Sequence, residues 1–329
     1  MPTMSCDHDH APGETCTVRE LTVFAPSGVE LRADALKRAR QRLQALGWKV
    51  TLDASVRARH QRFAGDDEAR LATLQRIAEA APDVAMACRG GYGMTRLLDR
   101  VDWAQIARSI EQGTRWVGYS DFTPLQLGLL AHVKPGRGGS APITWHGPMA
   151  CDDFGRGDDD GGLDEVTRDC FAEAMSGELE AVGFRTEAGF DGLEARGLLW
   201  GGNLAMVLSL LGTPHWPRIK GGILFLEDVN VHPYALERGL LQLLQAGVLG
   251  AQKAVVLGRF NHWKPSPLDR GYTLKSAIAR LRAECPVPVL TGLPFGHQPA
   301  GAEVEPKVTL PVGARVQLLV SGRDALIGW

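Results

Sequence analysis

Three side chains that could together carry out nucleophilic catalysis each come shortly after an apolar, strand-like run of the sequence. They are Ser120, Glu227 and His297, in the order serine, acid, histidine. In such a set the histidine takes the serine proton and later gives it to the leaving amine, while the carboxylate fixes the imidazole tautomer and stabilises its protonated form. Residues far apart in sequence can converge when each stands at the carboxyl edge of a sheet. The pattern therefore predicts a hydrolytic site assembled from three strand ends.

Ser120 has the position of a nucleophile on a sharp turn between a strand and a helix. Trp116 and Val117 form a short apolar strand that runs into Gly118, and leucines at helical spacing follow from Leu125. A serine on such a turn is exposed beside the backbone N–H groups of a helix start. The alternative is that Ser120 only caps the helix, which serine commonly does. The turn alone favours a helix-capping role for Ser120. The presence of the acid and the histidine favours the role of a nucleophile.

The acid and the base are ambiguous when each is considered alone. Glu227 could be an ordinary surface carboxylate beside Asp228, and a loop histidine such as His297 is more often a surface residue than a catalyst. His146 and His232 are rival bases, and His146 is the nearer of the two to the serine in sequence. The interpretation depends on the complete set, because all three residue types follow strands in one chain.

A glycine-rich stretch, Arg89-Gly-Gly-Tyr-Gly93, follows a further apolar run. Glycines let a backbone approach a substrate closely and direct its N–H groups at it. We expect the N–H groups of Gly91 and Asp121 to bind an oxyanion, an interaction worth about 3 kcal/mol per donor. A nucleotide-binding loop is the alternative. However, Arg96 stands where the dinucleotide fingerprint needs its third glycine, and the sequence has no GxxxxGK[ST] motif.

Composition indicates a soluble globular protein. Hydrophobic residues make up 44% of the chain and charged residues 22%, as in folded domains rather than disordered ones. The net charge of −2 argues against nucleic acid or an anionic membrane as a partner. No apolar run approaches the roughly 20 residues of a membrane helix. The start of the chain lacks the basic and apolar regions of a signal peptide, so a cytoplasmic location is expected.

The cysteines give no sign of a disulfide framework or of a zinc site. Six cysteines are scattered without CxxC spacing, which indicates reduced cytosolic thiols. Cys6, His8, His10 and Cys16 could in principle bind a metal. A polar tail is the favoured interpretation, because chain termini are usually disordered.

An acidic segment superficially resembles a calcium-binding loop. Residues 158–160 are aspartates and Gly161 follows them. If Gly161 held the turn position of such a loop, Arg156 would be its first ligand and Thr167 its bidentate acid. Both are the wrong residue types, so we expect no metal site here and no cofactor.

Apolar runs of strand length alternate with segments of helical spacing in the first half of the chain. Strands are expected there at 21–25, 48–52, 84–88, 116–117 and 143–145. This alternation predicts an α/β fold with a doubly wound parallel sheet that helices cover on both faces. In the second half, strands are expected at 197–203, 222–227, 254–257 and 287–290, with closing strands at 308–310 and 316–320.

The length of 329 residues predicts two domains. Between residues 151 and 192 aspartates and glycines are frequent, which is typical of a solvated connection. The expected division is a flexible tail at 1–17, an N-terminal nucleophile domain at 18–150, a linker at 151–192 and a C-terminal domain at 193–329 that carries the acid and the histidine.

Eight short blocks, in order along nearly the whole chain from Leu21, carry a resemblance to a known family. The blocks are Ala25-Pro-Ser27, Phe63-Ala-Gly-Asp66, Arg89-Gly-Gly-Tyr-Gly93, Gly118-Tyr-Ser-Asp121, His146-Gly-Pro-Met149, Gly201-Gly-Asn-Leu204, Leu226-Glu-Asp228 and Gly296-His297. With them the chain resembles the LD-carboxypeptidase family of serine peptidases. Each block is short, but their combination and order are highly specific.

The resemblance implies an N-terminal α/β domain and a smaller C-terminal mixed α/β domain, in a homodimer, with the site in an interdomain cleft. It implies that Ser120, Glu227 and His297 are catalytic and that the oxyanion is bound near Gly91 and Asp121. The implied reaction cleaves the amide between an L-centre and a terminal D-amino acid. It releases D-alanine from cytoplasmic murein tetrapeptides during peptidoglycan recycling, without a metal.

Substrate contacts are expected from Arg89, Gly90, Tyr92 and Asn203, which lie in the matching blocks. The acidic segment at 152–160 and the Cys/His-bearing start depart from the family pattern. Both segments lie away from the blocks. They therefore leave open which peptide is preferred, but they do not affect the expected chemistry.

Three other functions stay open at this point. An immunity peptidase of the same family would cleave a peptide–nucleotide antibiotic and would stack an aromatic loop residue on the base, for which Trp200, Trp216 and Trp263 are candidates. A non-catalytic peptide-binding relative would keep the fold without the chemistry. A metallohydrolase is the most remote of the three.

Overall fold

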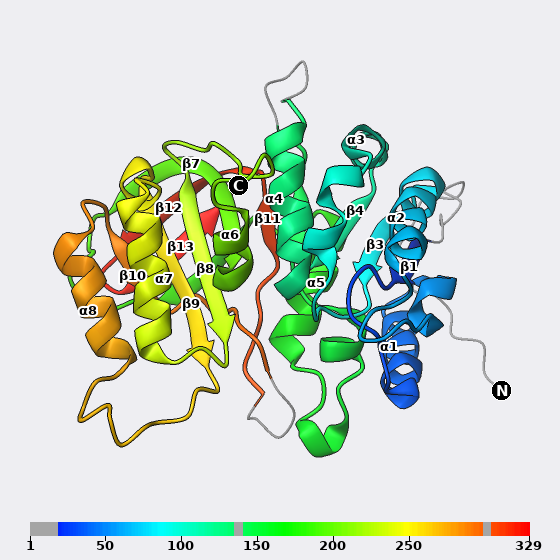
Figure 1. Cartoon of the computed structure of the whole chain (residues 1–329), viewed down its shortest axis with the longest axis horizontal. Coiled ribbons are helices and arrows are strands. Elements are labelled where there is room, and N and C mark those ends of the chain that lie inside the picture. Colours follow the sequence, from blue (N-terminus) through cyan, green and yellow to red (C-terminus); the bar gives the residue numbers. More distant parts are fainter. Residues whose placement is uncertain (1–18, 135–140, 299–303) are drawn as a thin grey trace, which may run out of the picture.

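The computed structural model describes residues 19–134, 141–298 and 304–329. Two sheets lie side by side, with the N-terminal elements in blue and cyan forming one half and the yellow to red elements forming most of the other (Figure 1). The α/β fold with a parallel N-terminal sheet and a mixed C-terminal sheet, expected from the sequence, is confirmed.

The first sheet has the strand order β11-β5-β4-β3-β1-β2. Its members are β1 (Glu20–Phe24), β2 (Lys49–Leu52), β3 (Val84–Ala87), β4 (Arg115–Gly118), β5 (Thr144–His146) and β11 (Leu310–Val312). Strands β1 to β5 pair in parallel, and only β11 is antiparallel to its neighbour β5. Every residue of β3 is buried, because a parallel sheet is covered on both faces.

Helices connect the parallel strands of this sheet. They are α1 (Ala33–Ala45), α2 (Asp67–Ala80), α3 (Trp103–Glu111) and α4 (Thr123–His132). The sequence specifies their ends locally. The Asp66 carboxylate accepts a hydrogen bond from the N–H of Ala69 (2.8 Å) and so caps α2. That helix ends at Ala80, and the next residue, Ala81, caps it in the left-handed conformation just before Pro82.

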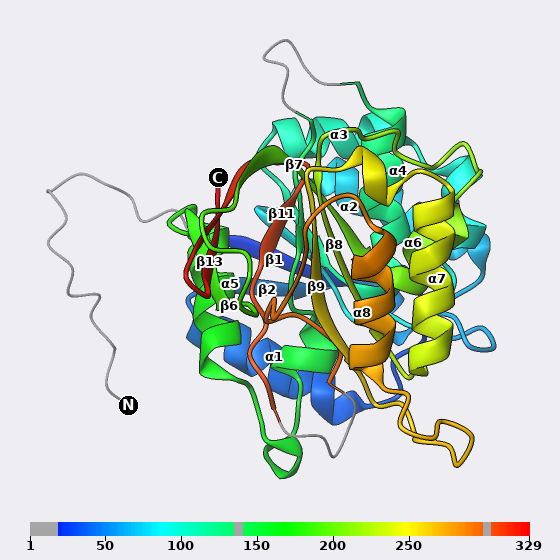
Figure 2. The ribbon, with the colours of Figure 1, turned by 90° about the vertical axis from the view of Figure 1, so that its left-hand side faces the viewer.

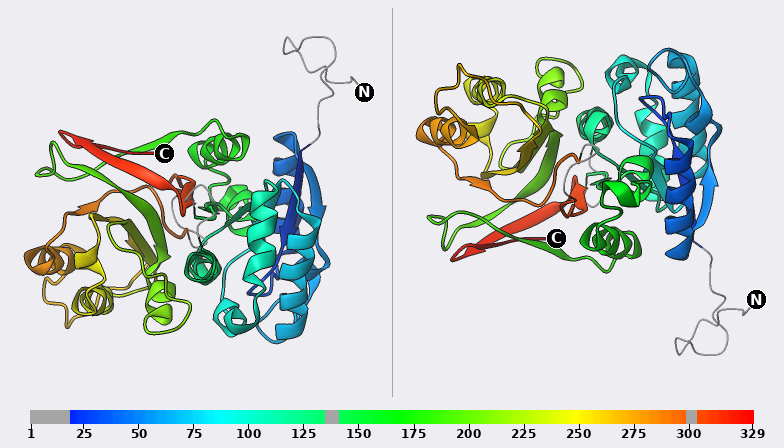
Figure 3. Two further views of the ribbon diagram at one scale, coloured as in Figure 1. Left: turned by 90° about the horizontal axis from the view of Figure 1, so that it is seen from above. Right: turned by 90° about the horizontal axis from the view of Figure 1, so that it is seen from below.

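The second sheet has the order β10-β9-β8-β7-β12-β13-β6. Its strands are β6 (Ala181–Arg185), β7 (Glu194–Asn203), β8 (Ile223–Val229), β9 (Ala254–Asn261), β10 (Val289–Thr291), β12 (Arg315–Ser321) and β13 (Asp324–Gly328). Strands β7 to β10 are parallel, whereas β12, β13 and β6 are antiparallel. The connecting helices are α6 (Leu204–Leu210), α7 (Pro233–Gln245) and α8 (Leu274–Glu284). Figures 2 and 3 show α7 and α8 packed side by side on one face of this sheet.

Two segments join the halves more closely than composition indicated. The stretch 151–192, expected as a linker, contains the helix α5 (Glu165–Ser176), and Phe154 and Phe171 pack edge to face in the buried core beside α1. In addition, β11 lies late in the chain yet pairs with β5 of the first sheet. The exact domain boundaries stay a prediction. Among the described residues, no helix combines the length and the apolar character needed to span a membrane.

A pair of glycine substitutions tests how tightly β7 and β8 are packed. A Cβ on Gly201 would lie 1.9 Å from the carbonyl oxygen of Phe225, whereas one on Gly212 would meet nothing within 4 Å. Both glycines have positive φ. We expect Gly201→Ala to reduce the free energy of unfolding by about 3 kcal/mol or more, and Gly212→Ala by about 1 kcal/mol. Urea denaturation measures both, and equal losses would contradict the close packing.

Candidate active site

The best-defined feature of the site is a hydrogen-bonded pair of Glu227 and His297. Glu227 lies near the end of β8 and is fully buried, and its Oε2 is 2.8 Å from His297 Nδ1. The register between β8 and β9 shifts at this point, between Leu226 and Asp228. Bulges of this kind redirect a side chain next to functional sites. The structure therefore brings the predicted acid and the predicted base together.

Each partner changes the pKa of the other. Burial alone would lower the pKa of His297, but the charge of Glu227 and its hydrogen bond outweigh burial and raise it. Burial alone would raise the pKa of Glu227, but His297 outweighs it and the pKa is lowered. With Nδ1 directed at the carboxylate, the imidazole carries its proton on Nδ1. Nε2 is then left as the base.

Ser120 occupies a strained turn at the end of β4. Its φ is +61°, in the left-handed region that non-glycine residues rarely adopt and that recurs at active sites. Ser120 is the first residue of the short 3₁₀ turn Ser120–Phe122, and α4 begins directly after this turn. No side-chain hydrogen bond caps either element, so the capping alternative does not describe this serine. Within the described part of the chain its hydroxyl makes no hydrogen bond, and such catalytic contacts often tighten only with substrate.

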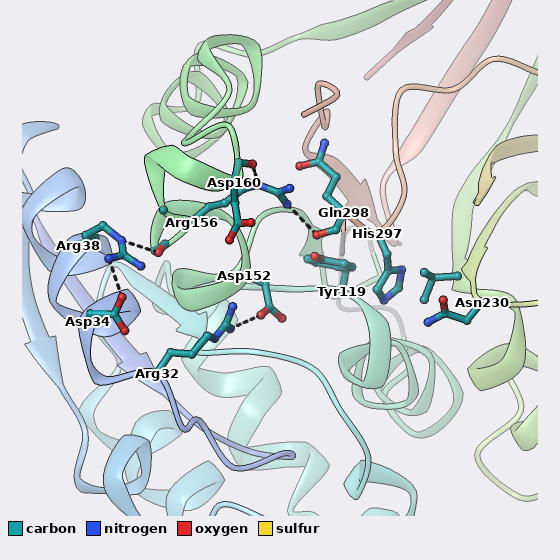
Figure 4. Close-up of a pocket in the computed structure, with 13 residues that line it drawn as sticks. Arg32, Asp34, Arg38, Tyr119, Asp152, Arg156, Asp160, Asn230, His297 and Gln298 are labelled. Carbon is teal, nitrogen blue, oxygen red and sulfur yellow. Dashed lines mark hydrogen bonds and ion pairs between the residues drawn. The ribbon is translucent and has the colours of Figure 1, made fainter. Parts of the chain in front are cut away.

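Tyr119 connects the serine turn to the histidine. Its ring is buried and lies edge to face against the ring of His297, with 5.0 Å between the centroids. The two side chains lie next to each other in a cleft of about 340 Å³, with Asn230 on the other side of His297 (Figure 4). The start of α1, the turn after β4, the segment 152–160 and the end of β8 line this cleft, so both halves of the molecule contribute to it. Ligand sites are common in such clefts. The charged residues along it are Arg32, Asp34, Arg38, Asp152, Arg156 and Asp160.

The glycine-rich loop packs directly on the serine turn. A Cβ on Gly90 would lie 2.8 Å from both Cβ and Oγ of Ser120. Gly91 has a φ of +106° and approaches Gly28, whose N–H donates to the Gly90 carbonyl oxygen (3.1 Å). Only glycine fits either position, which explains the paired glycines. The oxyanion role of the Gly91 and Asp121 N–H groups stays a prediction.

Buried polar groups hold this loop in place. The Arg70 guanidinium is fully buried and donates to the carbonyl oxygens of Gly93 (2.8 Å) and Pro26 (3.2 Å). The Asp121 carboxylate accepts from the N–H of Met94 (2.9 Å), and burial raises its pKa to about 6. These contacts fix the loop relative to the serine turn.

The predicted substrate-contacting residues fall into two groups. Arg89 donates to the carbonyl oxygen of Val29 (2.9 Å), and Tyr92, on the same loop, is 42% exposed and so open to a ligand. Asn203 is buried, and its Nδ2 donates to Asp228 Oδ1 (2.9 Å) and Glu227 Oε1 (3.3 Å). Asn203 therefore orients the carboxylates of Glu227 and Asp228.

The rival histidines have other partners. His146 is fully buried, its Nδ1 faces Gln126 Oε1 (3.1 Å), and burial lowers its pKa to about 3. His232 precedes α7 and its Nε2 lies 3.1 Å from an Asp269 oxygen. Of the three candidates, only His297 is hydrogen-bonded to the buried glutamate.

One cluster in the described residues has donors of metal-binding type. Glu30, Cys88 and Cys151 place their donor atoms within 4.8 Å of one another, and the two sulfurs are 3.3 Å apart. Arg32 donates to both carboxylate oxygens of Glu30 (3.0 and 2.9 Å), so the acid of this cluster is already paired with a cation. The cysteines and histidines at the start of the chain lie outside the described residues.

Comparison with known proteins agrees with this geometry. Family models described as the N-terminal and the C-terminal domain of LD-carboxypeptidase match residues 21–135 and 196–318. The crystal structure of muramoyltetrapeptide carboxypeptidase from Oxalobacter formigenes is 39% identical, covers 94% of this chain and 99% of its own, and superposes with a TM-score of 0.80. The chain belongs to the LD-carboxypeptidase family. Membership supports a peptidase, a hydrolase of carboxypeptidase type.

Two further proteins show how wide the likeness is. Murein tetrapeptide carboxypeptidase from Pseudomonas aeruginosa is 29% identical over 84% of this chain and 87% of its own. The structure of the microcin C7 self-immunity protein is 20% identical to this chain and superposes with a TM-score of 0.78. The match covers 96% of this chain and 97% of that protein. At that identity the second comparison shows a shared fold alone.

Substituting Gly90 tests whether the loop must touch the serine. We expect Gly90→Ala to lower kcat/KM on a cleaved peptide by about 100-fold or more, because the new methyl group displaces the Ser120 side chain. A matched control is Gly183→Ala on β6, where the nearest atom to an added Cβ is 3.9 Å away. Steady-state kinetics of both variants decide the matter. Full activity of Gly90→Ala would show that the loop does not constrain the nucleophile.

Substituting the acid tests the electrostatics of the pair. In Glu227→Gln the group that raises the pKa of His297 is gone while burial remains, so that pKa should fall. An NMR titration of the His297 ring protons, assigned with His297→Gln, measures the change. Asp228→Asn is the control, because Asp228 also raises the pKa of His297 but contributes less. An unchanged titration in Glu227→Gln would contradict the assigned pair.

Proposed function

We propose that the protein is a serine carboxypeptidase that hydrolyses the L,D-amide bond of a murein tetrapeptide and releases the terminal D-alanine. The observation that carries the proposal is the Glu227–His297 hydrogen bond (2.8 Å) in a cleft beside the strained turn of Ser120. The names of the relatives from Oxalobacter formigenes and Pseudomonas aeruginosa support the choice of substrate.

The reaction would proceed through an acyl-enzyme. Ser120 Oγ attacks the scissile carbonyl carbon while His297 Nε2 takes its proton. The N–H groups of Gly91 and Asp121 bind the oxyanion of the tetrahedral intermediate. When the intermediate collapses, the C–N bond breaks and His297 gives its proton to the departing amine. Water then attacks the ester carbon and gives a proton to His297, the bond to Ser120 Oγ breaks, and Ser120 takes the proton back from His297. Glu227 stabilises the imidazolium in both steps.

Further parts of the proposal concern the setting of the reaction. Arg89, Gly90 and Tyr92 would contact the peptide from the loop that packs on the serine turn. The cleft beyond His297 carries side chains of both signs, such as Arg32 and Asp152, which suits a peptide with charged groups. We propose that the enzyme acts in the cytoplasm, as a homodimer, in peptidoglycan recycling.

The structure gives little support to the immunity-peptidase alternative. Trp200 is fully buried, so it cannot stack on a nucleobase, and Trp216 is half-buried and packs edge to face against it (5.6 Å). Trp263 is also half-buried and lies 5.1 Å from the His232 ring, so Trp216 and Trp263 remain as candidates. Turnover of a peptide–nucleotide in preference to a murein tetrapeptide would favour this alternative. Tight binding of tetrapeptide without turnover would favour a non-catalytic relative.

The nucleophile assignment is tested by mass spectrometry of a murein tetrapeptide incubated with purified protein. The wild-type chain should remove one alanine, and Ser120→Ala should lower the rate by about 10⁴-fold or more. His232→Gln is the control, because that histidine lies outside the proposed machinery, and should keep the wild-type rate. Release of alanine by Ser120→Ala at the wild-type rate would overturn the assignment.

A further inference from the structure

A buried lysine joins the segment after His297 to the first sheet. Lys307 is fully buried, and its Nζ donates to the hydroxyl oxygen of Tyr119 (2.9 Å) and forms an ion pair with Asp153. Asp153 is itself buried and accepts a second hydrogen bond from the N–H of Met149 (2.8 Å). A buried charge persists only when it is paired and hydrogen-bonded, and here every partner comes from the nucleophile side of the cleft.

The chain around Lys307 passes between the two halves. The N–H of Val308 donates to the carbonyl oxygen of Pro294 (3.0 Å), close to His297 in the chain. The N–H of Lys307 itself donates to Thr167 Oγ1 on α5 (2.8 Å). Three residues further on, β11 begins at Leu310 and pairs with β5. Lys307 therefore lies where the segment that carries the histidine meets the sheet that carries the serine.

Tyr119 links Lys307 to the proposed catalytic residues Ser120 and His297. It directly precedes Ser120, its hydroxyl is held by Lys307, and the ammonium also lies over its ring (4.5 Å). Its ring packs edge to face with the rings of His297 and Phe295, with 5.0 and 5.5 Å between the centroids. A ring fixed at its hydroxyl end restricts the imidazole beside it, in the way that supporting groups orient catalytic side chains.

We propose that Lys307 is a positioning residue of this active site, which holds Tyr119, and through it the imidazole of His297, in register with the Ser120 turn. Nothing in the sequence pattern marks this lysine. The inference uses the proposed peptidase function for its kinetic readout. Its structural readout does not depend on that function.

The charged and titratable groups that face His297 define the expected pH effect. They are Glu227 and Asp228 from β8, His146 from β5, Tyr119 from the end of β4, and Lys307. Burial lowers the pKa of His297, Glu227 and Asp228 raise it, and the Lys307 ammonium lowers it. His146 is neutral, because burial lowers its pKa to about 3. Loss of Lys307 should therefore raise the pKa of His297 and move the acid limb of kcat/KM to higher pH.

The test compares variants that separate charge, pairing and packing. Lys307→Met alone leaves the buried Asp153 charge without its cation and destabilises the fold, so the main variant is Lys307→Met/Asp153→Asn, which removes both charges. We expect it to fold and to lose about 10- to 100-fold in kcat/KM at neutral pH. Its acid limb should shift less than that of Lys307→Met, because the Asp153 carboxylate removed with the ammonium has the opposite charge. Lys307→Arg keeps the charge and should keep the acid limb at its wild-type position.

Thr167→Val is the matched control, because it removes a hydrogen bond to the backbone of the same lysine without changing any charge. It should lower the melting temperature but leave the acid limb unmoved. A folded double variant with the wild-type rate would overturn the proposal, as would an unshifted His297 titration in Lys307→Met. If the wild-type protein cleaves no tetrapeptide, the proposed function fails. The His297 NMR titration in the same variants still tests Lys307.

Discussion

A carboxylate that is completely removed from water at the end of β8 is the constraint on which the site depends. A buried charge of this kind is costly unless each oxygen finds a donor. Glu227 finds His297 on one oxygen (2.8 Å) and Asn203 on the other (3.3 Å). Because these partners are obligatory for stability, the imidazole is oriented before any substrate arrives. Orientation of this kind is what catalysis by a serine and a histidine requires.

The same constraint extends to the nucleophile through one hydrogen-bonded path. Asn203 on β7 is the register partner of Glu227 on β8. Its backbone N–H donates to Thr123 Oγ1 (3.2 Å) at the start of α4. Thr123 follows the Ser120 turn directly, and α4 packs between the two halves beside α6 (Figure 1). The serine turn is therefore linked to the acid through Thr123 and Asn203. It is linked to the segment that follows His297 through Tyr119 and Lys307.

Much of this site could be predicted from the sequence, because short apolar runs mark the strands and therefore show where each strand ends. Apolar runs placed Ser120 and Glu227 at the edges of sheets, and the structure has β4 and β8 there. The choice of His297 over His146 needed the family resemblance. Periodicity cannot tell a histidine in a buried aromatic cluster from one facing a carboxylate.

Other features had no signal in the sequence. Lys307, Asp153 and Tyr119 are far apart in the chain, and only the tertiary fold brings them together. In the stretch 151–192, frequent aspartates and glycines obscured Phe154 and Phe171, whose burial makes part of that stretch a core element.

In the proposed function, a serine from one sheet and an acid–histidine pair from the other act as a single catalytic unit. The most direct test is a double-mutant cycle on kcat with Ser120→Ala, His297→Ala and the combined variant. Members of one unit are strongly non-additive, so the combined variant should be no slower than the slower single variant. If the two losses multiply instead, Ser120 and His297 act independently, and they do not form a catalytic unit.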